Sequence, residues 1–298
     1  MVNRLVLVMD PGISFAVLAA VAWGGYIFSL KRLFSDVSPA ALTVLLNSCA
    51  VVWYVPVVVS RTDVSRELVA GIEPVESGIV ALTVLMHAIA FMLFLWAIDD
   101  GDLSYVTPIS KIVPVFVLPV EVLLLGQVLT RIQVLGVVVA TVAVYVVNYE
   151  PGNLLGPIVN VYHSRPAQFA LLSAMCYAAG DVGKRVVLQE IGMPTALWVP
   201  TLLVGISLIL LPSAVRHPPS LTRRDIPRFV GVAAIVALAE HTTTTAFAIL
   251  PASIASPIVN TQAVIAVVLG GVLLGERYFR LRLFAAVMAV LGVTLIAL

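Results

Sequence analysis

The stretch that decides the fold is written twice in this chain. Residues 104–131 read SYVTPISKIVPVFVLPVEVLLLGQVLTR, and 149 positions later residues 253–280 read SIASPIVNTQAVIAVVLGGVLLGERYFR. Both copies predict one long apolar helix with a proline near its start, ending just before a glycine that the copies share. They differ at Lys111, which aligns with Asn260, so this helix carries a charge in one copy only.

The composition places the chain in a membrane. Of its 298 residues, 61% are hydrophobic and 11% are charged, whereas roughly a quarter of the residues of a soluble domain are charged. A transmembrane helix needs about 20 apolar residues, so the length is better counted in membrane spans than in soluble domains. The net charge of +1 gives no support to nucleic-acid binding. Two cysteines within apolar runs predict neither a disulfide framework nor a zinc site.

Long apolar runs, separated by Pro, Gly and charged residues, predict an all-α integral membrane protein with ten transmembrane helices. Only helices and closed barrels satisfy their backbone polar groups in hydrocarbon, and these runs are too long and continuous for barrel strands. The first run resembles a signal peptide, but Asp10-Pro11 interrupts it, so we expect a retained first span. The expected helices cover residues 12–33, 39–60, 77–98, 103–125, 132–149, 167–190, 194–214, 228–249, 252–274 and 281–298.

The chain divides into two copies of a five-helix unit. We expect a first repeat over residues 1–149, a linker over 150–166 and a second repeat over 167–298. Besides the opening stretch, Phe15-Ala16 recurs as Phe169-Ala170. Because five is an odd number, the second copy must enter the membrane from the opposite side. Inverted repeats are typical of secondary transporters, which bind their substrate near the midplane between the repeats.

The ends of the fourth and ninth helices resemble a known family. Residues 124–127 read Leu-Leu-Gly-Gln and residues 273–276 read Leu-Leu-Gly-Glu. This is similar to the Leu-Gly-Glu turn of the EamA-type branch of the drug/metabolite transporter (DMT) superfamily, from which Gln127 departs. The resemblance implies a central cavity lined by helices one, three, four, six, eight and nine, with helices five and ten apart from it. It names no cargo, since members move amino acids, other metabolites, nucleotide-sugars or toxic cations.

Lys111 leads a short set of candidate cargo-binding residues, because an ionisable side chain at mid-membrane costs about 2.5–3.5 kcal/mol and usually faces a cavity or a partner. Lys111 shares its helix face with Thr107, and Asn260 shares one with Ser256 at the same spacing. Together the two faces would form a polar wall with one cation, able to bind a carboxylate or a phosphate. The alternative is that Lys111 extends to the membrane interface.

Three further titratable side chains lie inside predicted helices: His87, Glu240 and His241. Each is a candidate for cargo binding or for carrying a coupling proton. Adjacent residues on a helix point about 100° apart, so Glu240 and His241 are not expected to face one cavity together. The alternative for each is a structural hydrogen bond between helices, worth about 0.6 kcal/mol.

The sixth predicted helix carries Asp181 and Lys184 three residues apart, with Tyr177 one turn before Asp181. We expect Asp181 either to contact the cargo or to form an ion pair with Lys184, which would lower the cost of inserting both charges. Lys184 and Arg185 are equally candidates for anchors at the membrane interface.

Aromatic and amide side chains complete the candidate site. Trp23 and Tyr177 occupy equivalent positions in the two repeats, and Tyr26 follows Trp23 by one turn. An aromatic wall suits apolar side chains or organic cations, although ordinary packing explains it equally well. Asn47 in the second helix and Gln262 in the ninth are further candidates.

Small residues recur at a spacing of four in the fifth and tenth predicted helices, as Gly136 and Ala140 and as Ala285 and Ala289. Such faces permit close helix approach. We expect the two helices either to pack against each other or to form the contact of a homodimer.

These observations predict a secondary transporter of the cell membrane that moves small metabolites such as amino acids by alternating access. Export is expected on the family resemblance alone, and the alternative cargo is a cationic drug-like compound. An intramembrane enzyme is disfavoured, because the chain lacks His-Glu-x-x-His and Gly-x-Ser-x-Gly motifs. We expect no catalytic residue, cofactor or metal. The expected partners are a small-molecule substrate, the lipid bilayer and coupling protons.

Overall fold

The computed structural model describes residues 11–35, 37–60, 73–125, 130–147, 163–219, 222–274 and 279–296, and every regular element among them is a helix. These elements are α1 (Pro11–Leu33), α2 (Pro39–Ser60), α4 (Pro74–Asp100), α5 (Leu103–Ser110), α6 (Val113–Leu125), α7 (Arg131–Val147), α9 (Arg165–Arg185), η1 (Val186–Glu190), α10 (Thr195–Arg216), α11 (Ile226–Ile249), α12 (Ala252–Asn260), α13 (Gln262–Leu273) and α14 (Phe279–Ile296). The predicted fourth helix corresponds to α5 and α6, the sixth to α9 and the π-helix η1, and the ninth to α12 and α13. The Gly126-Gln127 and Gly275-Glu276 turns and most of the expected linker lie outside the described residues.

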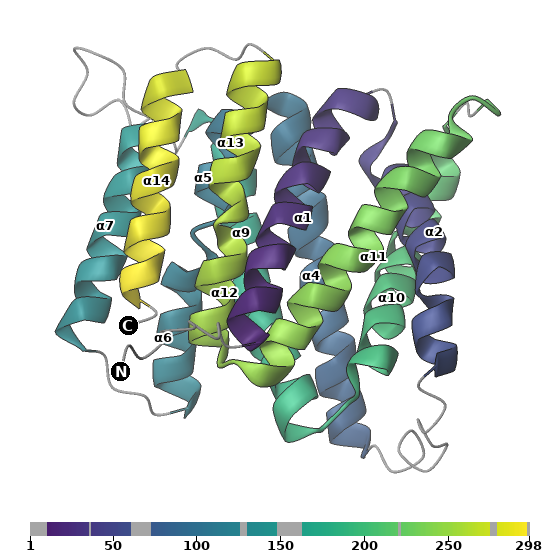
Figure 1. Cartoon of the computed structure of the whole chain (residues 1–298), viewed down its shortest axis with the longest axis horizontal. Coiled ribbons are helices and arrows are strands. Elements are labelled where there is room, and N and C mark those ends of the chain that lie inside the picture. Colours follow the sequence, from purple (N-terminus) through teal and green to yellow (C-terminus); the bar gives the residue numbers. More distant parts are fainter. Residues whose placement is uncertain are drawn as a thin grey trace, which may run out of the picture.

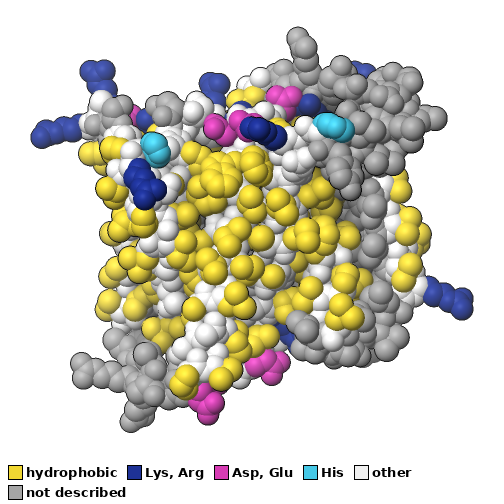
Figure 2. All heavy atoms as spheres, turned by 180° about the vertical axis from the view of Figure 1, so that it is seen from behind, with side chains coloured by type: hydrophobic (Ala, Val, Ile, Leu, Met, Phe, Trp, Pro, Cys, Tyr) yellow, Lys and Arg dark blue, Asp and Glu magenta, His cyan; other side chains and the backbone are white. Residues whose placement is uncertain are grey.

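The outer surface of the helices is that of a membrane protein. Seven helical segments in the described chain are long and apolar enough to cross a membrane. Large apolar side chains such as Val52, Leu208 and Val272 are exposed, and Figure 2 shows a broad apolar belt with most charged side chains at its upper and lower edges. Apolar surface of this extent requires lipid or a partner to cover it. The chain is a multi-pass integral membrane protein.

The fourth predicted helix is interrupted, which corrects the expectation of one long helix over residues 103–125. α5 ends at Ser110 and α6 begins at Val113, while Lys111 adopts φ −101° and ψ 13° between them. Pro114 contributes to the break, because its nitrogen has no hydrogen to donate to the carbonyl of Ser110 and its ring would clash with that carbonyl in a continuous helix. Pro108 and Pro119, by contrast, lie within α5 and α6. Lys111 therefore caps α5 and does not lie within a helix.

The ninth predicted helix is interrupted at the equivalent place, a second correction. α12 ends at Asn260 and α13 begins at Gln262. Thr261 between them donates both its hydroxyl, at 2.7 Å, and its backbone N–H, at 3.1 Å, to the carbonyl of Ile258. The backbone bond spans three residues, as in a 3₁₀ turn, instead of the four residues of an α-helix. Both halves thus break the same helix, and discontinuous helices line the binding sites of many secondary transporters.

The two halves run in opposite directions and pack reciprocally. In Figure 1, α5 lies above α6, whereas α12 lies below α13. α1 packs against α11, and their counterparts in the other half, α9 and α4, pack against each other. α2 packs against α10, its own counterpart. The two halves are therefore inverted copies that surround one interior.

α7 and α14 form a separate pair at one edge of the molecule (Figure 1). Gly136 on α7 is buried, as are Ala285 and Ala289 on α14. Small side chains let the two backbones approach closely. Of the two alternatives for these helices, packing against each other is confirmed, and the homodimer stays a prediction.

Candidate functional site

A cavity of about 100 Å³ lies among helices of both halves. All six helices that the family resemblance implies contribute to its wall. α2 and α10 contribute as well, through Asn47 and Leu202, which corrects the expected set, whereas the described parts of α7 and α14 contribute nothing. The predicted site residues on the wall are Trp23, Tyr26, Asn47, His87, Lys111, Tyr177, Asp181, Glu240, Asn260 and Gln262.

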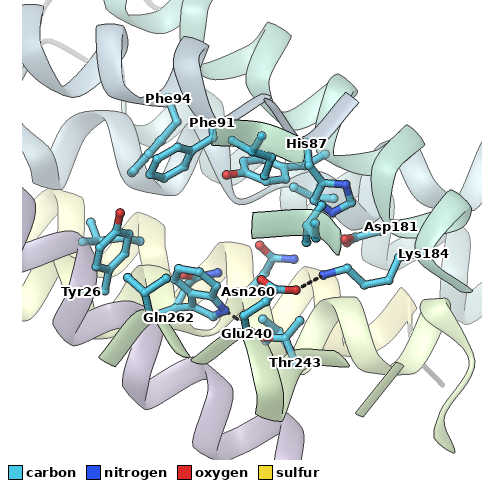
Figure 3. A pocket seen from close by; sticks show the side chains of 18 of the residues that line it. Tyr26, His87, Phe91, Phe94, Asp181, Lys184, Glu240, Thr243, Asn260 and Gln262 are labelled. Carbon is cyan, nitrogen blue, oxygen red and sulfur yellow. Dashed lines mark hydrogen bonds and ion pairs between the residues drawn. The ribbon is translucent and has the colours of Figure 1, made fainter. Parts of the chain in front are cut away.

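The cavity has an aromatic end and a charged end (Figure 3). The aromatic end contains Tyr26, Phe91 and Phe94, and the charged end contains Asp181, Lys184 and Glu240. Trp23 belongs to the aromatic end through its contact with Tyr26. The Tyr26 ring stacks on Phe91 with centroids 6.2 Å apart and meets Trp23 edge-on at 5.3 Å. The Trp23 indole donates to the Thr243 hydroxyl at 2.8 Å, which joins α1 of the first half to α11 of the second. The aromatic end is therefore a packed, apolar surface suited to an apolar group.

The charged end contains a buried ion pair between two helices of the second half. Lys184 Nζ on α9 lies 2.8 Å from Glu240 Oε1 on α11, and both side chains are almost completely buried. The Thr244 hydroxyl donates to the same carboxylate oxygen at 3.1 Å. The expected pairing of Lys184 with Asp181 is wrong, because the partner comes from a neighbouring helix, and so is the interfacial position for Lys184. The two charges of this pair neutralise each other.

Asp181 is held by the broken ninth helix. Ser256 donates its hydroxyl to Asp181 Oδ2 at 2.7 Å, and the Asn260 amide donates to the Ser256 carbonyl and hydroxyl at 2.7 and 3.1 Å. Ser256 itself does not line the cavity, because its hydroxyl is engaged with the carboxylate that does. Among the described residues Asp181 forms no ion pair, although the positive charges of Lys184 and Lys111 act on its carboxylate from beyond contact distance.

Lys111 lies at the cavity, where Asp181 attracts its charge without direct contact. Its ammonium lies 4.6 Å from the centroid of the Tyr177 ring and 5.0 Å from that of Phe94, within the range of cation–π attraction. In the part of the chain that the structure describes, Lys111 makes no ion pair. Its side chain is buried against the cavity, so extension to the membrane interface is wrong. The ammonium is available to an anionic group of a cargo.

Two predicted site residues lie off the wall. Thr107 is completely buried within the packing of α5 and does not line the cavity. His241 directs Nδ1 at the Tyr54 hydroxyl of α2, 2.9 Å away. Glu240 and His241 therefore face different neighbours, as their angular separation on the helix predicts.

His87 occupies the middle of α4, at the junction with α9. Its Nδ1 lies 2.9 Å from the carbonyl oxygen of Thr83, one turn earlier. The ring meets Tyr177 edge-on with centroids 6.0 Å apart. Gly180 on α9 makes room for it, since a Cβ there would lie 2.6 Å from both Cε1 and Nδ1 of the ring.

Phe91, Phe94 and Lys184 are cavity residues that the candidate set lacks. Phe91 and Phe94 follow His87 by four and seven residues, a spacing that places all three on one helix face. Once His87 is assigned to the cavity wall, that spacing predicts that Phe91 and Phe94 line the cavity as well. Lys184 has the same relation to Tyr177, seven residues earlier, but its partner Glu240 depends on how α9 and α11 pack.

Comparisons with known proteins extend this description. Residues 10–149 and residues 165–298 each match the EamA-like transporter family. A chain from a crystal structure of a protein aligns with a TM-score of 0.69 at 14% sequence identity, over 96% of this chain and 98% of that chain. At that identity the likeness concerns the fold alone. No curated protein matches the sequence.

Proposed function

Because the chain belongs to the EamA-like transporter family, we propose that it is a secondary transporter of zwitterionic metabolites, amino acids above all, in the cell membrane. The balance of charge in the cavity supports this cargo. Lys184 and Glu240 neutralise each other, while Lys111 and Asp181 attract each other without forming an ion pair among the described residues. The cavity thus offers one positive and one negative charge, each without an opposite charge in direct contact among those residues.

A free amino acid complements each part of the cavity. Its carboxylate pairs with the Lys111 ammonium, its ammonium pairs with the Asp181 carboxylate, and its side chain reaches the aromatic end. A buried charge without a partner is costly, whereas a paired and hydrogen-bonded one is tolerated. Binding of a zwitterion therefore gives both charges a direct partner at once, which a cargo of single charge cannot do.

The two halves are proposed to expose this site alternately to the two sides of the membrane. They are inverted copies, and Lys111 and Asn260 line the cavity at the breaks of the two interrupted helices. Such breaks let half-helices tilt separately around a fixed site. The sequence contains no nucleotide-binding P-loop, so we expect a gradient to drive transport, and the family resemblance favours export.

Glu240 is the group that we propose to carry a coupling proton. Its carboxylate already receives hydrogen bonds from Lys184 and Thr244, and its protonation would loosen the ion pair at the cavity wall. In proteoliposomes, Glu240→Gln is then expected to abolish uptake driven by a pH gradient while leaving exchange of cargo intact. An unchanged response to the gradient would exclude this role.

A cationic drug-like compound is the second candidate cargo. The observation that favours it is that aromatic rings and the carboxylates of Asp181 and Glu240 line the same cavity. This combination attracts organic cations. Lys111 opposes it, because an ammonium within the same buried cavity repels a second positive charge. We therefore rank the zwitterion first.

A thermal-shift panel on purified wild-type and Lys111→Met protein separates the two cargo classes. Amino acids are expected to stabilise the wild type, and Lys111→Met to weaken their binding about tenfold to a hundredfold, since a hydrogen bond to a charged group is lost. Organic cations should bind the variant as well as or better than the wild type. Lys111→Arg keeps a cation and should retain part of the amino-acid binding. Stabilisation by organic cations alone would contradict the proposed cargo.

A further inference from the structure

His87 is fixed in one tautomer by its own helix. The carbonyl oxygen of Thr83 can only accept a hydrogen bond, so the 2.9 Å contact with Nδ1 requires Nδ1 to carry the proton. A neutral imidazole has one N–H, and the other nitrogen then presents a lone pair. In neutral His87, Nε2 is therefore a hydrogen-bond acceptor.

This acceptor is buried at the cavity with nothing to accept from. His87 is 5% exposed and lines the cavity, and Nε2 has no hydrogen-bond partner among the described residues. Figure 3 shows the ring directed toward the charged end. The nearby Lys184 ammonium is engaged with Glu240 at 2.8 Å. A buried polar atom without a partner destabilises the structure, and a group that supplies the missing donor recovers that loss.

The ring is also held in place from several sides, as a binding group must be. Gly180 leaves no room for a side chain beneath it, the Tyr177 ring meets its edge, and the Thr83 carbonyl fixes its rotation. Because the contacts fix both position and tautomer, the imidazole is preorganised at the cavity wall with Nε2 as its acceptor.

We propose that His87 Nε2 accepts a hydrogen bond from the cargo's ammonium group and so selects cargo that carries an N–H donor. This selection rests on the proposed amino-acid function and deepens it. Lys111 and Asp181 are charged and attract the cargo by its charges, which a fully methylated ammonium retains, although Asp181 also accepts an N–H hydrogen bond. His87 recognises the hydrogen on the nitrogen, which a fully methylated ammonium lacks.

A methylation series on one amino acid tests the proposal. The probes are leucine and its N-methyl, N,N-dimethyl and N,N,N-trimethyl derivatives, which share a carboxylate, a side chain and a cationic nitrogen. Only the last lacks an N–H. Binding is measured on full-length protein at about pH 8, above the ordinary imidazole pKa of about 6.5. The wild type is expected to lose about tenfold or more in affinity at the step from dimethyl to trimethyl, which removes the last N–H. The loss should be smaller at the earlier steps, because each replaces one N–H but leaves at least one donor.

Variants of His87 show whether the loss of affinity between the dimethyl and trimethyl derivatives depends on the imidazole. His87→Leu removes the acceptor and should reduce the last step to the part that Asp181 contributes, whereas His87→Gln places an amide oxygen near the position of Nε2 and should keep the full step. Gly180→Ala leaves His87 in the chain but displaces its ring, so the step should shrink. His241→Leu removes an imidazole that faces Tyr54 and is the matched control, expected to leave the series unchanged.

The outcomes separate this inference from the proposed function. If leucine is bound and transported but the wild type binds the dimethyl and trimethyl forms with the same affinity, the proposed role of His87 is wrong and the amino-acid function stands. The role is equally wrong if His87→Leu keeps the full step. If no member of the series binds folded wild-type protein, the proposed function fails and this inference fails with it.

Discussion

At the residue scale, the buried Lys184–Glu240 pair shows how this protein stabilises two charges in its interior. Removing two charges from water costs several kcal/mol per ion, which their attraction and further hydrogen bonds offset only when the geometry is good. The 2.8 Å contact and the added Thr244 hydroxyl meet that condition. Each charge of the pair is therefore tolerated because of the other.

Breaking this pair from one side should destabilise the protein more than removing both charges. Lys184→Met or Glu240→Gln alone leaves a buried charge unpaired, at an expected cost of about 3–5 kcal/mol in the free energy of unfolding. The double variant should be closer to the wild type than either single variant. Denaturant unfolding of the four purified proteins (wild type, the two single variants and the double variant) measures their free energies of unfolding. If the loss in the double variant equals the sum of the two single losses, the two side chains do not stabilise each other.

The same pair shows which features of the charged residues can be predicted from the sequence and which cannot. Asp181, Lys111 and Glu240 were identifiable because charges within apolar runs are rare and must face something polar. Their partners were not. The sequence favours the neighbour three residues away, whereas Lys184 pairs with a residue 56 positions later, because that pairing is decided by how α9 packs beside α11.

At the element scale, Gly24 decides how closely the halves approach. A Cβ at Gly24 on α1 would lie 2.6 Å from Ile265 Cβ and Cγ2 on α13. The neighbouring Gly25 has open space at the same position, with nothing within 4 Å. α1 and α13 come from different halves, so this glycine sets the spacing across the interface that encloses the cavity.

Two alanine substitutions at adjacent positions test that contact. Gly24→Ala should lower the free energy of unfolding by about 1–3 kcal/mol, the usual cost of overpacking, and reduce transport as well. Gly25→Ala should be neutral or stabilising by up to about 1 kcal/mol, because alanine favours helix over glycine. Thermal melting in detergent compares the two. Equal effects would mean that α1 and α13 are not in close contact.

The helix breaks mark the limit of element-level prediction. The duplicated stretch was correctly assigned to two equivalent transmembrane elements, yet both were expected to be continuous. Pro114 is a visible signal, since it removes the bond to Ser110. Thr261 is not, because a threonine inside a helix usually directs its hydroxyl to a carbonyl without ending the helix. Its effect depends on the surrounding helices.

At the scale of the whole molecule, the inverted repeat was predictable from the count of spans in each half. The two family matches and the reciprocal packing agree with it. What the sequence did not reveal is the balance of charges in the cavity. Lys111 and Asp181 come from different halves and belong to one site only because the inverted copies interlock.

Exchange of an amino acid across proteoliposome membranes tests the central claim most directly. Vesicles that contain the purified protein and unlabelled leucine are diluted into trace radiolabelled leucine, without ATP or an imposed gradient of pH. A single site exposed to one side at a time predicts that labelled leucine accumulates transiently above its outside concentration, and that Lys111→Met removes the accumulation. Simple equilibration that ignores the internal leucine, or no uptake of any amino acid by folded protein, would contradict the account.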